Sequence, residues 1–113
     1  MELNQEIYEK LKRYPYLCNM YLERETEKNY NFSLKLVFCD FFNHCMDDRL
    51  LIIFSDVQSL EMKNLDGLLR AYIIVRDLSD RQLENINYYV KESEEDMFSF
   101  YCSSIEVKTS HVI

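Results

Sequence analysis

The spacing of apolar residues changes at Pro15, and this change limits the folds that the chain can adopt. Before Pro15, Leu3, Ile7 and Leu11 recur every fourth residue, so a helix would carry them on one face. Acidic residues lie near the start of this segment and basic residues near its end, which is the order that the helix dipole favours. The residue before a proline avoids helical angles, so we expect one N-terminal helix that stops at Pro15.

Beyond the proline, apolar and polar residues alternate, as they do in strands with one buried face. The clearest example is residues 32–39, while residues 50–54 are apolar on both faces, which favours a central strand. That central strand can extend to Met62, before the hairpin signal Asp66-Gly67. The other strand patterns lie at residues 18–23, 69–78, 86–91 and 98–107. Consecutive strands with short connections pair antiparallel.

These patterns predict an α+β fold, in which the N-terminal helix packs on one face of a curved, mainly antiparallel sheet of about six or seven short strands. The chain has 113 residues, of which 48% are apolar and 14% aromatic, enough for one hydrophobic core. No linker or repeat divides it, so we expect a single domain spanning residues 1–113. No segment resembles an export signal, and the longest apolar run is too short to cross a membrane, so we expect a cytoplasmic protein.

The formal net charge is −7, from 13 basic and 20 acidic residues. Proteins bind DNA and RNA by neutralising phosphates with lysine and arginine, so this balance argues against a nucleic-acid partner. It also argues against docking on an anionic membrane. A basic protein is the partner that such a surface would attract fastest, because long-range electrostatic fields steer the encounter.

The four cysteines, Cys18, Cys39, Cys45 and Cys102, are scattered through largely apolar stretches. Without a secretion signal, we expect them to be reduced thiols. A zinc site could combine Cys39, His44 and Cys45 with Cys18 or Cys102, but structural zinc ligands usually occur in closely spaced pairs, which this chain lacks. We therefore predict no metal site.

The chain also offers little for catalysis. Its histidines are His44 and His111, and we expect His111 to lie in a frayed tail. A cysteine–histidine pair must lie within hydrogen-bond reach, and His44 beside Cys45 on one loop is poorly placed for this. Gly67 alone cannot form a phosphate-binding loop, so we expect no nucleotide cofactor. We predict a protein without enzymatic activity or a cofactor; a hydrolase that uses His44 is the last alternative.

The aromatic residues divide into two groups by their place in the strand patterns. The phenylalanines at inward-facing positions predict a core made of Phe32, Phe38, Phe54, Phe98 and Phe100. Three tyrosines, Tyr72, Tyr89 and Tyr101, occupy the strand positions that alternate with the main set of apolar residues, so they should stand on the outer face of the sheet. Tyrosine is enriched in protein interfaces, so these three are candidate anchors for a partner.

Negative charge is concentrated between residues 77 and 96, where seven acidic residues stand against two basic ones. The acidic residues fall in two connections, with Asp77, Asp80 and Glu84 in the first and Glu92, Glu94, Glu95 and Asp96 in the second. If the strands between them are antiparallel neighbours, the two connections lie at opposite ends of one hairpin. They are either a solubilising rim or a docking surface for a basic protein.

Four segments, 51–60, 73–78, 86–90 and 97–102, resemble the immunity proteins of bacterial polymorphic-toxin and contact-dependent growth inhibition systems. The resemblance covers about residues 50 to 107 and rests on strand patterns, not on a catalytic motif or on contact residues. It implies a protein that binds its cognate toxin domain, often a nuclease, in the cytoplasm and blocks it.

We therefore interpret the chain as an immunity-type inhibitor, a monomer or weak homodimer that contacts a basic toxin domain. The expected contacts are Asp77, Asp80, Glu84, Glu92, Glu94, Glu95 and Asp96, with Tyr72, Tyr89 and Tyr101 as anchors. Two other hypotheses stay open at this point. One is a non-enzymatic subunit or adaptor, or a homodimer joined through an exposed strand edge. The other is an inhibitor that mimics nucleic acid, which would need acidic residues in rows.

Overall fold

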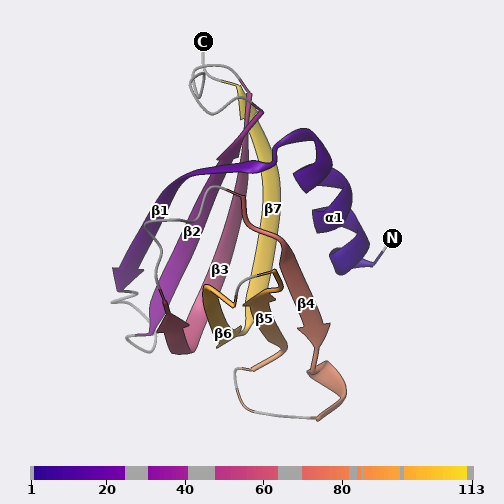
Figure 1. The fold of residues 1–113 in the computed structure, drawn as a ribbon. Coiled ribbons are helices and arrows are strands. Elements are labelled where there is room, and N and C mark those ends of the chain that lie inside the picture. The colour runs from indigo at the N-terminus through magenta and orange to yellow at the C-terminus, as the bar shows by residue number, and fades with distance from the viewer. Residues whose placement is uncertain are drawn as a thin grey trace.

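The computed structural model describes residues 2–24, 31–40, 48–63, 70–81, 84, 86–94 and 96–111. These residues form one α-helix, seven strands and a short 3-10 helix. The elements are α1 (Leu3–Arg13), β1 (Tyr16–Arg24), β2 (Phe32–Cys39), β3 (Asp48–Met62), β4 (Ile73–Asp77), η2 (Ser79–Arg81), β5 (Tyr88–Glu92), β6 (Phe98–Cys102) and β7 (Ser104–His111). Figure 1 shows α1 lying against a bent, open antiparallel sheet, which confirms the predicted α+β fold.

Helix α1 ends just before the proline, as predicted, and its apolar stripe faces the sheet. Ile7 is fully buried, and Leu3 and Leu11 are partly buried against the same core. The helix also covers part of β4, an edge strand. The backbone N–H of Val75 in that strand donates a hydrogen bond of 3.1 Å to Oδ1 of Asn4. Because an open strand edge can pair with another chain, this bond protects part of that edge.

The sheet is organised around β3, the longest strand. The strand order is β1-β2-β3-β6-β5-β4, and β7 pairs with the first half of β3. All these pairs are antiparallel. β3 runs to Met62, as expected, and its 15 residues make it longer than the short strands that the sequence predicts. His111, which we expected in a frayed tail, is the last residue of β7 and pairs with Asp48.

A sharp bend in β3 explains how one strand serves two halves of the sheet. Asp56 and Ser59 have left-handed φ angles of 56° and 55°. Up to Ser55 β3 pairs with β7, and from Gln58 onward it pairs with β6, with a register shift between Gln58 and Glu61. Ser103, between β6 and β7, donates its backbone N–H to the carbonyl oxygen of Ser55 (2.9 Å) and its hydroxyl to the carboxylate of Asp56. These bonds hold the two strands together at the bend.

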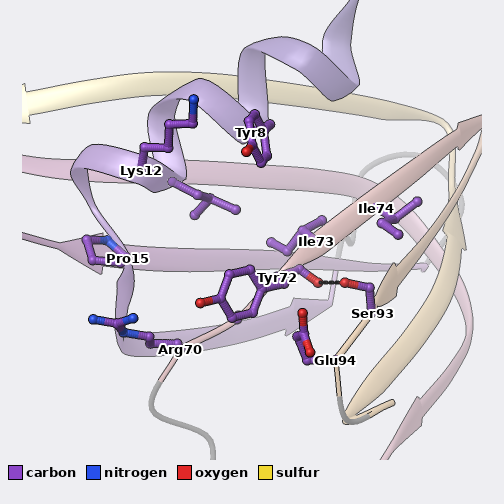
Figure 2. A pocket seen from close by; sticks show the side chains of 11 residues that line it. Tyr8, Lys12, Pro15, Arg70, Tyr72, Ile73, Ile74, Ser93 and Glu94 are labelled. Carbon is purple, nitrogen blue, oxygen red and sulfur yellow. Dashed lines mark hydrogen bonds between the residues drawn. The ribbon is translucent and has the colours of Figure 1, made fainter.

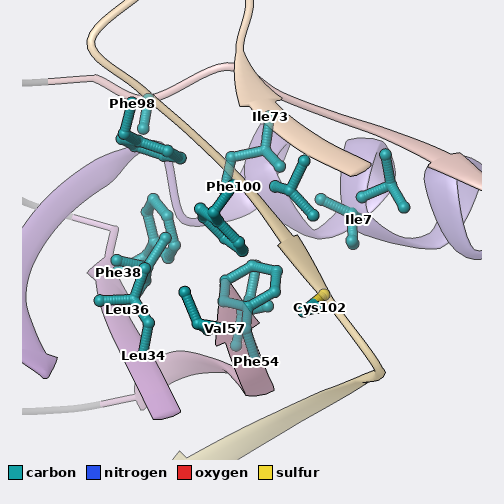
Figure 3. Close-up of a cluster of buried hydrophobic side chains, with 14 of the residues drawn as sticks. Ile7, Leu34, Leu36, Phe38, Phe54, Val57, Ile73, Phe98, Phe100 and Cys102 are labelled. Carbon is teal, nitrogen blue, oxygen red and sulfur yellow. The ribbon is translucent and has the colours of Figure 1, made fainter. Parts of the chain in front are cut away.

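The hydrophobic core lies on the face of the sheet that α1 covers (Figure 3). Phe38, Phe54, Phe98 and Phe100 are buried, as the sequence predicts, and Phe32 is partly buried against them. The rings of Phe54 and Phe100 meet edge to face, with centroids 4.9 Å apart. Aromatic pairs in this arrangement contribute beyond the area that they bury. One continuous core therefore joins the helix to both halves of the sheet.

The expectation that all four cysteines are reduced thiols is wrong for two of them. Cys18 in β1 and Cys39 at the end of β2 form a disulfide, with Cα atoms 6.5 Å apart. The register of these strands shifts between Leu17 and Asn19, and Cys18 lies at that shift. The extra residue brings its sulfur to Cys39, which strict alternation does not predict. Cys102 is free and buried in β6, and Cys45 lies outside the described residues.

Candidate protein-binding surface

The two acidic connections lie at opposite ends of one hairpin, as the sequence analysis expected for antiparallel neighbours. β4 and β5 pair so that Ile73 stands opposite Glu92 and Asp77 opposite Tyr88. At about 3.3 Å per residue, the strands hold the two ends roughly 13 Å apart. The acidic residues therefore form two separate groups, and a partner that contacts both must extend along the hairpin.

In the first connection, Asp77 has a local structural role. Its Oδ1 atom accepts hydrogen bonds from the hydroxyl (2.6 Å) and the backbone N–H (2.9 Å) of Ser79. These two bonds, the side-chain bond first, lower the pKa of the Asp77 carboxyl below its ordinary value. Leu78 is buried beside this turn, while Asp80 and Glu84 are exposed. The first connection therefore offers Asp80 and Glu84 as acidic groups that the turn does not use.

In the second connection, the structure contradicts the prediction that Glu92 is a surface contact. Its exposed fraction is 0%, and its Oε2 atom accepts hydrogen bonds from the backbone N–H groups of Tyr72 (3.2 Å) and Glu94 (3.0 Å). A buried carboxylate is stable only when such donors replace water. Glu92 thus holds the turn after β5 against the start of β4, and no part of it reaches the surface.

The remaining acidic residues of the second connection are accessible. Glu94 and Asp96 are exposed, and Glu95 lies outside the described residues. Asp96 has a left-handed φ of 57°, a conformation that aspartate tolerates better than most residues. The ion pairs between described residues include Glu9–Lys12, Arg13–Asp48 and Glu106–Lys108. None of these pairs involves Glu94, Asp96 or the exposed acidic residues of the first connection, so their negative charge is not neutralised within this part of the chain.

The three predicted tyrosine anchors lie in two places. Tyr89 in β5 and Tyr101 in β6 are cross-strand neighbours, with ring centroids 5.0 Å apart, and both are half-buried. Their sequence neighbours Val90 and Phe100 are in the core, and successive strand residues point to opposite faces, so the two tyrosines stand on the face turned away from α1. Tyr72 precedes β4 and lies apart from this pair.

Tyr72 lines a groove that the sequence analysis did not predict. The groove has a volume of about 510 Å³ and lies between α1 and the chain entering β4. Figure 2 shows Tyr8, Lys12 and Pro15 on one side, with Arg70, Tyr72 and Ile74 facing them and Ser93 and Glu94 at one end. The sequence could have predicted the side of the groove that α1 forms, because Tyr8 and Lys12 are one helical turn apart beside the apolar stripe. The opposite side could not be found, because its position depends on how β4 is placed against the helix.

Two cations in the groove contact aromatic rings. The Nζ atom of Lys12 lies 4.6 Å from the ring centroid of Tyr8. The guanidinium of Arg70 lies 5.0 Å from the ring centroid of Tyr16 and donates a hydrogen bond of 3.1 Å to its hydroxyl oxygen. Hydrogen bonds with Tyr16 and then Tyr72 raise the pKa of Arg70 above its ordinary value. The groove lining therefore carries two cations, Lys12 and Arg70, and one carboxylate, Glu94, on a protein that is acidic as a whole.

Comparison with known families decides what kind of protein carries this surface. The family model of immunity protein PIM8 matches residues 2–108, which include α1, the complete strands β1 to β6 and the first part of β7. The chain belongs to the immunity protein PIM8 family. The match confirms the resemblance seen in the sequence and extends it through the N-terminal helix. The searches of the curated proteins and of the solved structures each find no match.

Membership of the PIM8 family implies an immunity-type role, in which the chain binds a cognate toxin. In this family member, the one free thiol among the described residues, that of Cys102, is poorly suited to act as a nucleophile. Burial, followed by the charge of Asp56, raises the pKa of Cys102 to about 12, so its thiol stays protonated at neutral pH. Among the described residues, no group of three or more histidine, cysteine or acidic side chains could hold a metal ion. His44 and Cys45, the other candidates for a zinc site or a catalytic pair, lie outside those residues.

The described part of this PIM8 family member contains no helix that is long and apolar enough to span a membrane.

Proposed function

We propose that this protein neutralises its cognate toxin by binding the toxin domain through the acidic surface of the β4–β5 hairpin. It does so in the cytoplasm, as a monomer or weak homodimer, without enzymatic activity. Asp80, Glu84, Glu94 and Asp96 contact a basic surface of the toxin, and Glu95 and Asp77 add to the negative field. The observation that carries this proposal is the family match over residues 2–108, on a fold whose hairpin ends carry exposed acidic groups outside the described ion pairs.

Charge complementarity gives these residues a specific task. A toxin domain that acts on nucleic acid needs a basic groove for the phosphates, and acidic side chains on a compact hairpin are complementary to such a groove. The attraction guides the two proteins into contact and fixes their orientation, and it accelerates association more than it slows dissociation. The toxin is then blocked because its substrate groove is covered.

The test compares two variants with the same net charge. The first carries Asp80→Lys, Glu84→Lys, Glu94→Lys and Asp96→Asn, where asparagine is chosen because position 96 is left-handed. The control carries Glu2→Lys, Glu23→Lys, Glu106→Lys and Asp40→Asn, at exposed positions outside the two connections. The probe is the cognate toxin domain in a catalytically inactivated form, and the measurement is the association rate at several salt concentrations.

We expect the hairpin variant to associate about tenfold more slowly than the wild type and to lose most of its salt dependence. The control variant should associate several times faster than the hairpin variant, although both carry the same net charge. Equal association rates for the two variants would mean that total charge alone matters. If both variants associate as fast as the wild type, the acidic connections keep the protein soluble and do not guide binding.

A further inference from the structure

The groove between α1 and β4 gathers exposed apolar side chains in an unusual way. Among the described residues, the large apolar side chains that are exposed are Tyr8, Tyr21, Leu22, Met62, Tyr72 and Ile74. Tyr8, Tyr72 and Ile74 all line this one groove, between helix and edge strand (Figure 2). Exposed apolar groups that cluster in a concave site mark binding surfaces more often than the same groups scattered singly.

We propose that this groove docks one segment of the cognate toxin, which places an apolar side chain between Tyr8, Tyr72 and Ile74 and an acidic side chain against Lys12 and Arg70. This inference rests on the proposed function, because it takes the toxin domain as the partner. It assigns to the groove a second part of the interface, with the opposite charge from the acidic connections.

The charge of Arg70 is the reason to expect an acidic side chain. Its guanidinium bonds to the phenol of Tyr16 and packs on the ring, and a phenol provides no negative charge. No described carboxylate forms an ion pair with Arg70. Lys12 does pair with Glu9, at 3.5 Å, but both of these side chains are about half exposed, so the pair is weak and can be exchanged for another. Figure 2 shows Lys12 and Arg70 at the Pro15 end of the groove, away from Glu94.

The groove is also formed before a partner arrives. The carbonyl oxygen of Tyr72 accepts hydrogen bonds from the backbone N–H (2.7 Å) and the hydroxyl (3.1 Å) of Ser93, and its N–H donates to Glu92. Ala71 and Ile73, on either side of Tyr72, are buried in the core. The backbone on this side of the groove is therefore fixed, and docking there orders few additional groups.

The partner must thus match a rigid site in both shape and charge. A segment with an apolar side chain followed by an acidic one has this chemistry. A segment rich in lysine and arginine would be repelled by Lys12 and Arg70, even though it suits the acidic connections.

The first experiment uses two tyrosines with the same exposed fraction. Tyr72 in the groove and Tyr21 on β1 are each 45% exposed, and Tyr21 also contacts a cation, with Nζ of Lys35 5.0 Å from its ring centroid. We expect Tyr72→Ala to raise the dissociation constant for the inactivated toxin domain at least tenfold, mainly through faster dissociation. Tyr21→Ala should change it less than twofold. Ile74→Ser, with Leu22→Ser as its control, repeats the comparison at exposed fractions of 43% and 46%.

The second experiment tests the charge. Arg70→Glu should weaken binding at least thirtyfold, whereas Lys108→Glu, an exposed reversal on β7, should change it less than threefold. Thermal unfolding of each variant confirms that it folds, and the Ile74 pair decides the matter if Tyr72→Ala is unstable.

The outcomes separate the two proposals. If wild-type protein does not bind the toxin domain, the proposed function fails and this inference fails with it. If wild-type protein binds and the Tyr72 and Ile74 variants bind equally well, the groove is not part of the interface and only this inference is overturned. If those variants bind weakly but Arg70→Glu does not, the acidic part of the proposed segment is wrong.

Discussion

Replacing Glu92 tests whether this residue supports the fold or contacts the partner. Its buried Oε2 atom accepts two backbone hydrogen bonds, from Tyr72 at 3.2 Å and from Glu94 at 3.0 Å. Hydrogen bonds to a charged group contribute about 1.5 to 3 kcal/mol each, so the two together contribute about 3 to 6 kcal/mol. Alanine also removes the cost of burying a carboxylate, which offsets part of that loss. We expect Glu92→Ala to lower the free energy of unfolding by about 3 kcal/mol.

Urea unfolding followed by circular dichroism measures this change, and a thermal scan should show a melting temperature about 12 °C lower, at about 4 °C per kcal/mol for a domain of this size. Glu92→Gln keeps an acceptor oxygen and should lose about half as much stability. Glu94→Ala is the control, because replacing this exposed side chain should change the free energy of unfolding by less than about 0.5 kcal/mol. The reasoning is refuted if Glu92→Ala unfolds like the wild type while its affinity for the toxin domain falls.

Three further predictions concern the cysteines and the first acidic turn. The bond between Cys18 and Cys39 spans 21 residues, so reducing it should lower the free energy of unfolding by about 3 kcal/mol, seen as a lower urea midpoint with reductant than without. Cys102, with a pKa of about 12, should react with a thiolate-specific reagent at pH 8 only after unfolding, and rapid labelling at Cys102 itself in the folded protein, located by peptide mapping, would contradict its burial. The pKa of Asp77 is lowered on folding, so its contribution to stability is present above about pH 4 and is lost as pH falls through the lower, folded value. Ser79→Ala removes the hydroxyl bond to Asp77 and keeps the backbone bond, so acid unfolding should be less steep in this variant, and identical profiles would show that the hydroxyl bond does not matter.

Much of the fold follows from the spacing of apolar residues. Apolar residues at every fourth position before Pro15 predict a helix with one apolar face, and Ile7 on that face is buried. Apolar residues at every second position predict strands with one buried face, and four phenylalanines on those faces are buried. The same twofold alternation also predicts that Glu92 is buried. Val90 faces the core, and Glu92 follows it by two positions in the same strand, so both point inward. Because Glu92 is charged and adjoins a polar connection, it was assigned to that connection, and its inward position was missed.

Other features could not be predicted, because they depend on local departures from regular strands. The bend of β3 uses left-handed angles at Asp56 and Ser59, and the alternation of apolar and polar residues does not mark these two positions. The disulfide depends on one extra residue at Cys18, which no pattern of alternation reveals. The groove depends on the fit of α1 against the start of β4. Tyr72 was predicted as an anchor from its parity, but its neighbour across the groove, Tyr8, belongs to a different element.

The positions of these groups allow a single interface of ordinary size. Glu94 belongs both to the second acidic connection and to the lining of the groove, so these two sites are continuous. The first connection lies roughly 13 Å further along the hairpin. A standard interface covers about 800 Å² on each partner, a disc of about 16 Å radius, so one centred on β4 reaches all three sites. Tyr89 and Tyr101 lie one and two strands away from that edge, on the face turned away from α1. Ile74 lies between buried Ile73 and Val75, so alternation along β4 turns it toward that same face. Since α1 already protects the same edge through Asn4 and Val75, a partner held there gains its affinity from side chains in the groove more than from strand pairing.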